Sequence, residues 1–86
     1  MSSHIVMYTT ASCPFCMNAE RLLLNRGVKW IDKIRVDLEP ELRLEMMEKT
    51  GRRTVPQIYI DERHIGGFEE LRALDLAGKL EPLLAA

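Results

Sequence analysis

A nearly continuous apolar run, HIVMYT (His4 to Thr9), stands close to the start of the chain. Its β-branched and aromatic side chains are typical of a short strand that is buried on both faces. A strand of this kind must lie inside a sheet, with helices packed on each side. We therefore predict that this run is the first and central strand of an α/β fold.

The segments that follow fit this prediction. Apolar residues at helical spacing, with Pro14 at the start and Gly27 after the end, predict a helix over Pro14 to Arg26. Alternating apolar residues predict a second strand over Val28 to Val36, in which Asp32 is the one misfit. Three more features are a helix from Pro40 closed by Gly51, a hairpin of Val55 to Ile60 and Arg63 to Ile65, and a helix over Phe68 to Ala77 ended by Gly78. The order β-α-β-α-β-β-α implies a mixed four-stranded sheet with helices on both faces.

Length and charge limit the possible functions. The chain has 86 residues, which suffice for one compact core, so we expect residues 1–86 to form a single domain. A formal net charge of -1 provides no basic field for nucleic acid or an anionic membrane. The N-terminus does not resemble a signal peptide, and no apolar run approaches the roughly 20 residues of a membrane span. We expect a soluble cytoplasmic protein with no nucleic-acid or membrane partner.

Both cysteines lie in SCPFCM (Ser12 to Met17), between the first predicted strand and the first predicted helix. A helix N-terminus presents unpaired N–H groups and a partial positive charge, which stabilise an anion such as a thiolate. Cys13 should therefore have a lowered pKa, whereas Cys16, one turn further on, should be more buried and less acidic. The spacing lets the two cysteines close a disulfide. The segment thus indicates a reactive thiol pair.

Other uses of a cysteine pair fit the sequence less well. A zinc site needs four ligands, and His4 and His64 lack the spacing of paired ligands. Haem attachment requires a histidine directly after the second cysteine, where Met17 stands. A structural disulfide closing so short a loop would restrict the unfolded chain little. Redox chemistry without a metal is the favoured interpretation.

Three segments together resemble one family, the glutaredoxins, and the match runs nearly end to end. They are YTTASCPFC (Tyr8 to Cys16), GRRTVPQIYID (Gly51 to Asp61) and HIGGFEEL (His64 to Leu71). The similarity is greatest to the small dithiol glutaredoxins of bacteria. It implies a thioredoxin-like fold, a cis bond before Pro56, and glutathione as cosubstrate. It also implies that the Val55 backbone faces the cysteine pair and binds the thiol peptide as a short extra strand.

The resemblance further implies a set of glutathione-binding residues. The γ-glutamyl carboxylate would meet the N–H groups of Phe68 and Glu69 after the Gly66-Gly67 pair, and the Glu69 side chain would meet the ammonium. Family members commonly bind the glycyl carboxylate with a lysine three residues before the first cysteine, but this chain has Thr10 there. Arg52, Arg53 and Gln57 are the alternative partners, and the sequence does not choose among them. The full expected set is Thr10, Phe15, Arg52, Arg53, Thr54, Val55, Pro56, Gln57, Gly67, Phe68 and Glu69.

The resulting hypothesis is a glutathione-dependent thiol-disulfide oxidoreductase. Cys13 is the nucleophile toward glutathione mixed disulfides, and Cys16 resolves intermediates with protein disulfides. The expected partners are glutathione and glutathionylated or disulfide-containing proteins, among which the resemblance suggests ribonucleotide reductase; we expect a monomer. Two alternatives stay open: an iron-sulfur cluster carrier, which Pro14 disfavours, and a glutaredoxin-like electron donor recycled by thioredoxin reductase, which the Gly66-Gly67-Phe68-Glu69 segment disfavours.

Overall fold

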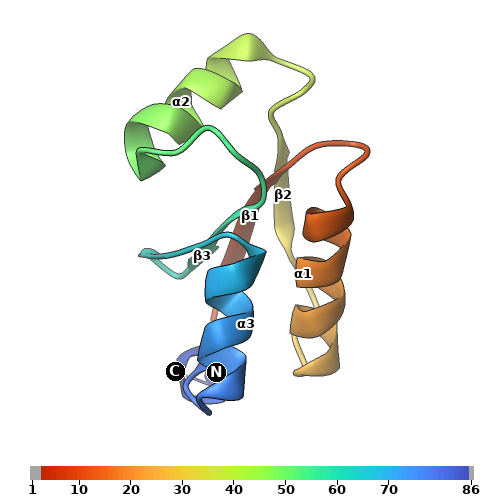
Figure 1. Cartoon of the computed structure of the whole chain (residues 1–86), viewed down its shortest axis with the longest axis vertical. Helices are drawn as coiled ribbons and strands as arrows, with labels where there is room; N and C mark the ends of the chain where they lie inside the picture. Colours follow the sequence, from red (N-terminus) through yellow and green to blue (C-terminus); the bar gives the residue numbers. More distant parts are fainter. Residues whose placement is uncertain (1–2, 86) are drawn as a thin grey trace.

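The sheet has four strands in the order β2-β1-β3-β4. The computed structural model describes residues 3–85 (Figure 1). Strand β1 (Ile5–Thr9) pairs in parallel with β2 (Asp32–Arg35) and antiparallel with β3 (Gln57–Ile60), and β4 (Arg63–Gly66) pairs antiparallel with β3. The first strand therefore has a neighbour on each side. The prediction that it is central is confirmed.

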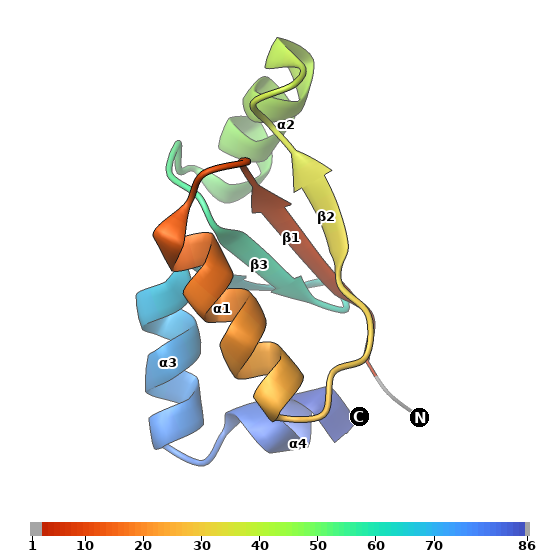
Figure 2. The same cartoon turned by 90° about the vertical axis from the view of Figure 1, so that its right-hand side faces the viewer.

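Helices cover the two faces of this sheet unequally. Helices α1 (Pro14–Asn25) and α3 (Phe68–Leu76) lie side by side on one face, and the short α4 (Leu80–Ala85) closes its lower end (Figure 2). Helix α2 (Pro40–Thr50) packs on the opposite face. The first face carries the larger core, which consists of Ile5, Met7, Ala19, Leu23, Ile31, Ile58, Ile60, Leu71, Leu80 and Leu84. The second face carries a smaller cluster of Tyr8, Val36, Met46 and Tyr59.

The alternation within β1 explains why its sequence is apolar throughout. Ile5 and Met7 point into the larger core, whereas Tyr8 belongs to the smaller cluster on the other face. Each of these side chains is 1% exposed. Burial of the Tyr8 ring, together with a 3.0 Å hydrogen bond from its hydroxyl to Glu45, raises the pKa of Tyr8 to about 12. The predicted burial of this strand on both faces is confirmed.

Two elements differ from the prediction. The second strand was expected over Val28 to Val36, but β2 contains only Asp32–Arg35. The ladder with β1 begins at the pair Val6 and Asp32, and in the same register Ile31 would lie opposite Ile5, the first residue of β1, so residues 28–30 extend beyond the strand that would pair with them. Even so, Val28 and Ile31 pack into the larger core.

The second difference is α4, which the sequence analysis did not predict. Leu80 and Leu84, one helical turn apart, are both buried against the larger core. Pro82 is tolerated because it stands in the first turn, where a backbone N–H has no partner within the helix. With this addition, the predicted order of elements and the mixed sheet with helices on both faces are confirmed.

Candidate active site

Cys13 is the N-cap residue of α1, at the point where the chain leaves the carboxyl end of β1. Its backbone is extended, and Pro14 follows as the first helical residue. The Cys16 N–H donates a 3.1 Å hydrogen bond to Cys13 Sγ. The helix terminus therefore aims one of its free donors at this sulfur, as a stabilised thiolate requires.

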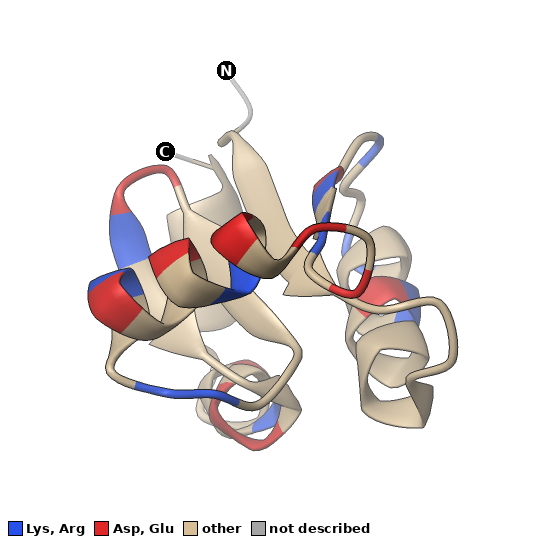
Figure 3. Ribbon diagram, turned by 90° about the horizontal axis from the view of Figure 1, so that it is seen from above, with Lys and Arg blue, Asp and Glu red and all other residues tan. Residues whose placement is uncertain are grey.

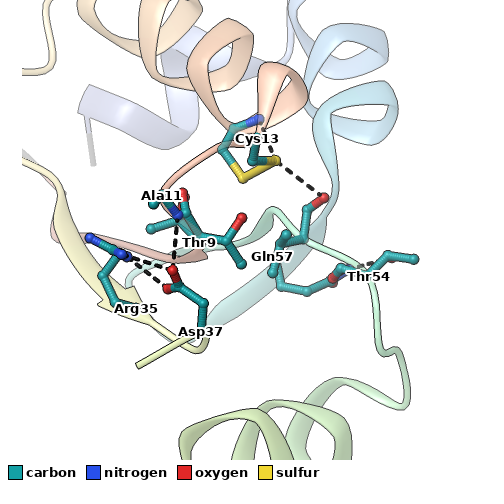
Figure 4. Close-up of a disulfide and its surroundings, with 10 residues drawn as sticks. Thr9, Ala11, Cys13, Arg35, Asp37, Thr54 and Gln57 are labelled. Carbon is teal, nitrogen blue, oxygen red and sulfur yellow. Dashed lines mark hydrogen bonds and ion pairs between the residues drawn. A yellow bond between two sulfur atoms is a disulfide. The ribbon is translucent and has the colours of Figure 1, made fainter. Parts of the chain in front are cut away.

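The two cysteines form a disulfide, with their Cα atoms 5.2 Å apart (Figure 4). Cys13 is 8% exposed and Cys16 only 3%, so Cys13 is the more accessible sulfur, as predicted. Cys16 lies one turn inside the helix. The pair therefore presents Cys13 nearer to solvent and keeps Cys16 more deeply buried.

The segment Thr54-Val55-Pro56 faces the cysteine pair across a short gap. The bond between Val55 and Pro56 is cis, as the resemblance implies. The Val55 carbonyl oxygen lies 3.8 Å from Cys13 Sγ, a contact drawn as a dashed line from Cys13 in Figure 4. Among residues 3–85, no hydrogen bond uses the Val55 N–H. This backbone is therefore available to an extended peptide beside the sulfur.

The N-terminus of α3 forms the next part of the site, and Glu70 organises it. Its Oε1 accepts a 2.7 Å hydrogen bond from the N–H of the N-cap residue Gly67 and a 2.8 Å hydrogen bond from Arg52 Nη1. The Arg52 hydrogen bond is the main reason that the pKa of Glu70 is lowered, with the Gly67 N–H second. One carboxylate thereby ties the loop that precedes Pro56 to the start of α3.

Gly66 is required by this arrangement. Its φ of +114° is one that residues with a side chain rarely adopt, and a Cβ added there would lie 2.6 Å from Glu70 Oε1. Gly67 is less restricted, since its Cβ would come no closer than 3.4 Å to the Pro56 carbonyl oxygen. Close approach of a ligand carboxylate to the glycine pair stays a prediction; what the structure shows is that the missing Cβ of Gly66 makes room for the Glu70 carboxylate.

These parts enclose a groove of about 420 Å³, here called the Pro56 groove. Its walls bring together most of the predicted glutathione-binding residues. Phe15 is 57% exposed, and the centroid of its ring lies 6.5 Å from that of Phe68. The lining residues are Phe15, Arg52, Thr54, Val55, Pro56, Gly67, Phe68, Glu69 and Glu70.

Three residues of the expected set do not line this groove. Gln57 is 0% exposed: its Nε2 donates to the Thr54 carbonyl at 2.9 Å, and its Oε1 lies 2.8 Å from His64 Nε2. Its side chain therefore supports the groove from below and has no surface to offer a ligand. Arg53 is exposed outside the groove, and its carbonyl accepts a hydrogen bond from Arg43. Thr10 lies on the other side of the cysteines.

That other side contains a smaller hollow of about 200 Å³, here called the β2-side cavity. It is lined by Met7, Thr9, Thr10, Ala11, Cys13, Cys16, Met17, Glu20, Lys33 and Arg35. Its two cations already have partners. Lys33 Nζ lies 2.8 Å from Glu20, and Arg35 donates two hydrogen bonds of 2.7 and 2.8 Å to Asp37.

Asp37 also anchors the segment that leads to Cys13. Its Oδ2 accepts a 3.3 Å hydrogen bond from the Ala11 N–H (Figure 4). The pair with Arg35 is the largest cause of a pKa of Asp37 far below the usual value. Sequence reasoning missed Asp37 because its contact joins two loops. It also missed Glu70, although the spacing from the N-cap Gly67 to a glutamate at the third helical position is a recognised capping signal.

The described residues contain neither a metal-binding cluster nor a membrane-spanning helix. Within residues 3–85, no group of three or more His, Cys, Asp and Glu side chains could hold a metal ion. In the same range, no helix has both the length and the apolar character needed to cross a membrane.

Comparisons with known proteins agree on one family. The glutaredoxin family model matches residues 5–65. The chain is 51% identical to the glutaredoxin of Pseudomonas aeruginosa, over 95% of this chain and 96% of the relative. It is 44% identical to glutaredoxin 3 of Escherichia coli K12, over 95% of this chain and 98% of the relative.

Solved structures agree as well. The crystal structure of a buckwheat glutaredoxin-glutathione complex superposes with a TM-score of 0.88 at 28% identity, over 96% of this chain and 77% of that one. The solution structure of glutaredoxin from Brucella melitensis gives a TM-score of 0.84 at 42% identity, over 96% and 89% of the two chains. The thioredoxin-like fold implied by the resemblance is confirmed.

Proposed function

This chain belongs to the glutaredoxin family of thiol-disulfide oxidoreductases, and we propose that its reductant and preferred mixed-disulfide group are glutathione. The observation that carries the proposal is the Pro56 groove, which starts beside Cys13 Sγ at Val55 and ends at the N-terminus of α3. A related protein from buckwheat has been solved as a glutathione complex.

The groove has a complement for each charged group of glutathione. The N–H groups of Phe68 and Glu69, in the first turn of α3, have no acceptor within the helix and are suited to the γ-glutamyl carboxylate. The exposed Glu69 side chain is suited to the ammonium group. Arg52, 2.8 Å from Glu70 at the groove wall, is the cation for the glycyl carboxylate. The cysteinyl part would pair with the Val55 backbone, placing its sulfur at Cys13.

The reaction proceeds by two exchanges at one sulfur. The Cys13 thiolate attacks the glutathione sulfur of a mixed disulfide, forming a bond to glutathione while the substrate leaves as a thiolate and takes up a proton. The thiolate of a second glutathione then attacks the bound glutathione sulfur, which releases glutathione disulfide and restores the Cys13 thiolate. With a protein disulfide, the Cys13 thiolate bonds to one protein sulfur and releases the other as a thiolate. The Cys16 thiolate then attacks Cys13 Sγ and releases the first protein sulfur, which leaves the Cys13–Cys16 disulfide. Two glutathione molecules reduce this disulfide.

Replacing each cysteine by serine tests these roles. Cys13→Ser should abolish turnover of a glutathione mixed disulfide, measured with glutathione and glutathione reductase. Cys16→Ser should retain this activity and lose reduction of protein disulfides, because only the second route needs a resolving thiol. Loss of both activities in Cys16→Ser would contradict the one-cysteine route.

The source of electrons separates the proposal from its main rival. Reduced Cys13–Cys16 should be regenerated by glutathione with glutathione reductase and not by thioredoxin reductase alone. The reverse result would assign the protein to the electron donors that do not use glutathione. We also propose that the protein acts in the cytoplasm as a monomer, and size-exclusion chromatography of the reduced chain at several concentrations tests the second point.

A further inference from the structure

A second groove continues from the Pro56 groove along the outside of α1 and α3. This α1–α3 groove has a volume of about 280 Å³ and is lined by Asn18, Arg21, Leu22, Asn25, Phe68, Arg72, Asp75 and Leu76. Figure 2 shows the two helices side by side at this face. Phe68 lines both grooves, and no other residue does. A ligand in the Pro56 groove therefore leaves the α1–α3 groove free.

The charges of the α1–α3 groove do not cancel. Its acidic side chain, Asp75, accepts hydrogen bonds of 2.6 and 2.8 Å from Arg26, the residue that caps the end of α1. Arg21 and Arg72 are exposed, and neither forms an ion pair with another residue of the range 3–85. Two positive charges thus line the same groove as two leucines, Leu22 and Leu76, of which Leu76 is 72% exposed.

The dimensions of the groove indicate what length of peptide it takes. From Phe68 to Asp75 the helix rises by about 10 Å, after which the Arg26–Asp75 ion pair closes the groove. An extended peptide covers this distance with about three residues. Arg21 also lies about 10 Å along α1 from Pro14, the residue after Cys13. A side chain that reaches Arg21 would therefore belong to a residue about three positions from the reacting cysteine.

We propose that the α1–α3 groove binds the protein part of the substrate, and that it selects acidic residues about three positions from the oxidised cysteine. The proposal rests on the function proposed above, because the glutathionyl group must occupy the Pro56 groove at the same time. Positive charge on Arg21 and Arg72 attracts the acidic side chains, and Phe68 and Leu76 cover the apolar side chains between them. The two grooves thus divide the substrate, with glutathione in one and the flanking peptide in the other.

Two glutathionylated peptides of equal length test the proposal. One carries glutamates three and four positions from its cysteine on both sides, and the other carries glutamines there. Two exposed ion pairs of ordinary strength correspond to about a fivefold higher kcat/KM for the glutamate peptide at low ionic strength. Salt should reduce this ratio because both arginines are exposed to solvent. The double variant Arg21→Gln and Arg72→Gln should bring the ratio close to one.

The control variant Lys29→Gln with Arg63→Gln removes the same charge from exposed sites outside both grooves, and should keep the preference. A small substrate, the mixed disulfide of glutathione and 2-mercaptoethanol, should be turned over equally by all three proteins, since it does not reach the α1–α3 groove. Equal rates for the two peptides with wild-type protein would overturn the proposal, as would a preference that survives in the Arg21 and Arg72 double variant. Absence of turnover with the small substrate would instead contradict the proposed function itself.

Discussion

The Pro56 groove and the β2-side cavity lie on opposite sides of the cysteine pair, and they use charge differently. In the β2-side cavity each cation has its own acidic partner: Lys33 pairs with Glu20, and Arg35 pairs with Asp37. In the Pro56 groove one carboxylate, Glu70, serves two donors, and the following N–H groups of α3 stay free. Arg35 donates to Asp37 from two guanidinium nitrogens, whereas Arg52 donates to Glu70 from Nη1 alone, so other N–H groups of Arg52 and of the α3 N-terminus can still bind a ligand.

Under the proposed function, this difference would allow a glutaredoxin lacking a lysine at position 10 to bind glutathione from the Pro56 side alone. On the Pro56 side, the donors are backbone N–H groups and Arg52. Their positions are set by the conformation of the loop before Pro56 and of α3. On the β2 side, Asp37 holds Ala11 and Arg35 together, which fixes the approach to Cys13 and leaves no cation unpaired among the lining residues. Substitutions on the two sides of the cysteine pair should therefore have unequal effects on stability and on glutathione turnover.

Gly66→Ala should have the largest effect. A Cβ at Gly66 would strain a backbone with φ of +114° and would also displace the Glu70 carboxylate, 2.6 Å away. We expect a loss of about 2 to 3 kcal/mol in the free energy of unfolding together with a raised KM for glutathione. Gly27→Ala is the matched control, because Gly27 has a φ of +95° but its Cβ would meet nothing within 4 Å. Equal losses in the two variants, from thermal unfolding, would show that only backbone strain matters.

Glu70→Gln should have the next largest effect, and its effect should depend on pH. The folded pKa of Glu70 is below its unfolded value, so the stability that the carboxylate contributes is present above about pH 4.5 and is lost as the pH falls through the lowered pKa. At pH 7 we expect a loss of about 1 kcal/mol. Melting temperatures of wild type and variant should converge below pH 4.

Glu20→Gln is the corresponding change on the β2 side. It removes the partner of Lys33 from an exposed ion pair, so a loss of at most about 0.5 kcal/mol is expected. A larger loss for Glu20→Gln than for Glu70→Gln at pH 7 would contradict the distinction between the two sides.

Most of the fold could be predicted from the sequence because each core element has a local signal. The apolar run of β1, Pro14 and Pro40 at helix starts, and glycines after helix ends are properties of single segments. The first residue of β2 could not be predicted in this way, because it depends on where β1 begins to offer partners. Helix α4 is short and contains Pro82, so its burial became visible only with the core in place.

Some residues of the candidate site could likewise be predicted from the sequence, and others could not. Cys13, Val55 and Gly67 belong to segments whose spacing carries information, and the structure places Val55 beside Cys13 and on the lining of one groove with Gly67. Gln57 has the side chain of a ligand-binding residue, but strand alternation turns it beneath the groove. Asp37 has no signal of its own, since its contact with Ala11 exists only after both loops are placed.

Thr10→Lys should have the smallest effect on the free energy of unfolding, because it acts on the ionisation of the reduced thiol, and it bears directly on the comparison. A lysine there would be the only cation of the β2-side cavity, as far as its described lining residues go, that lacks an acidic partner. A charge about 6 Å from the sulfur in a largely aqueous setting is worth about 0.7 kcal/mol, or about half a pKa unit. We therefore expect a slightly lower pKa for the Cys13 thiol of the reduced protein, and a KM for glutathione lowered about twofold.

Thr10→Met supplies a chain of similar bulk without charge, and ultraviolet titration of the thiolate should show no shift for it. If methionine and lysine shifted the pKa of the Cys13 thiol alike, packing at position 10 and not charge would govern it, and the unpaired cation of the β2-side cavity would have no bearing on the sulfur.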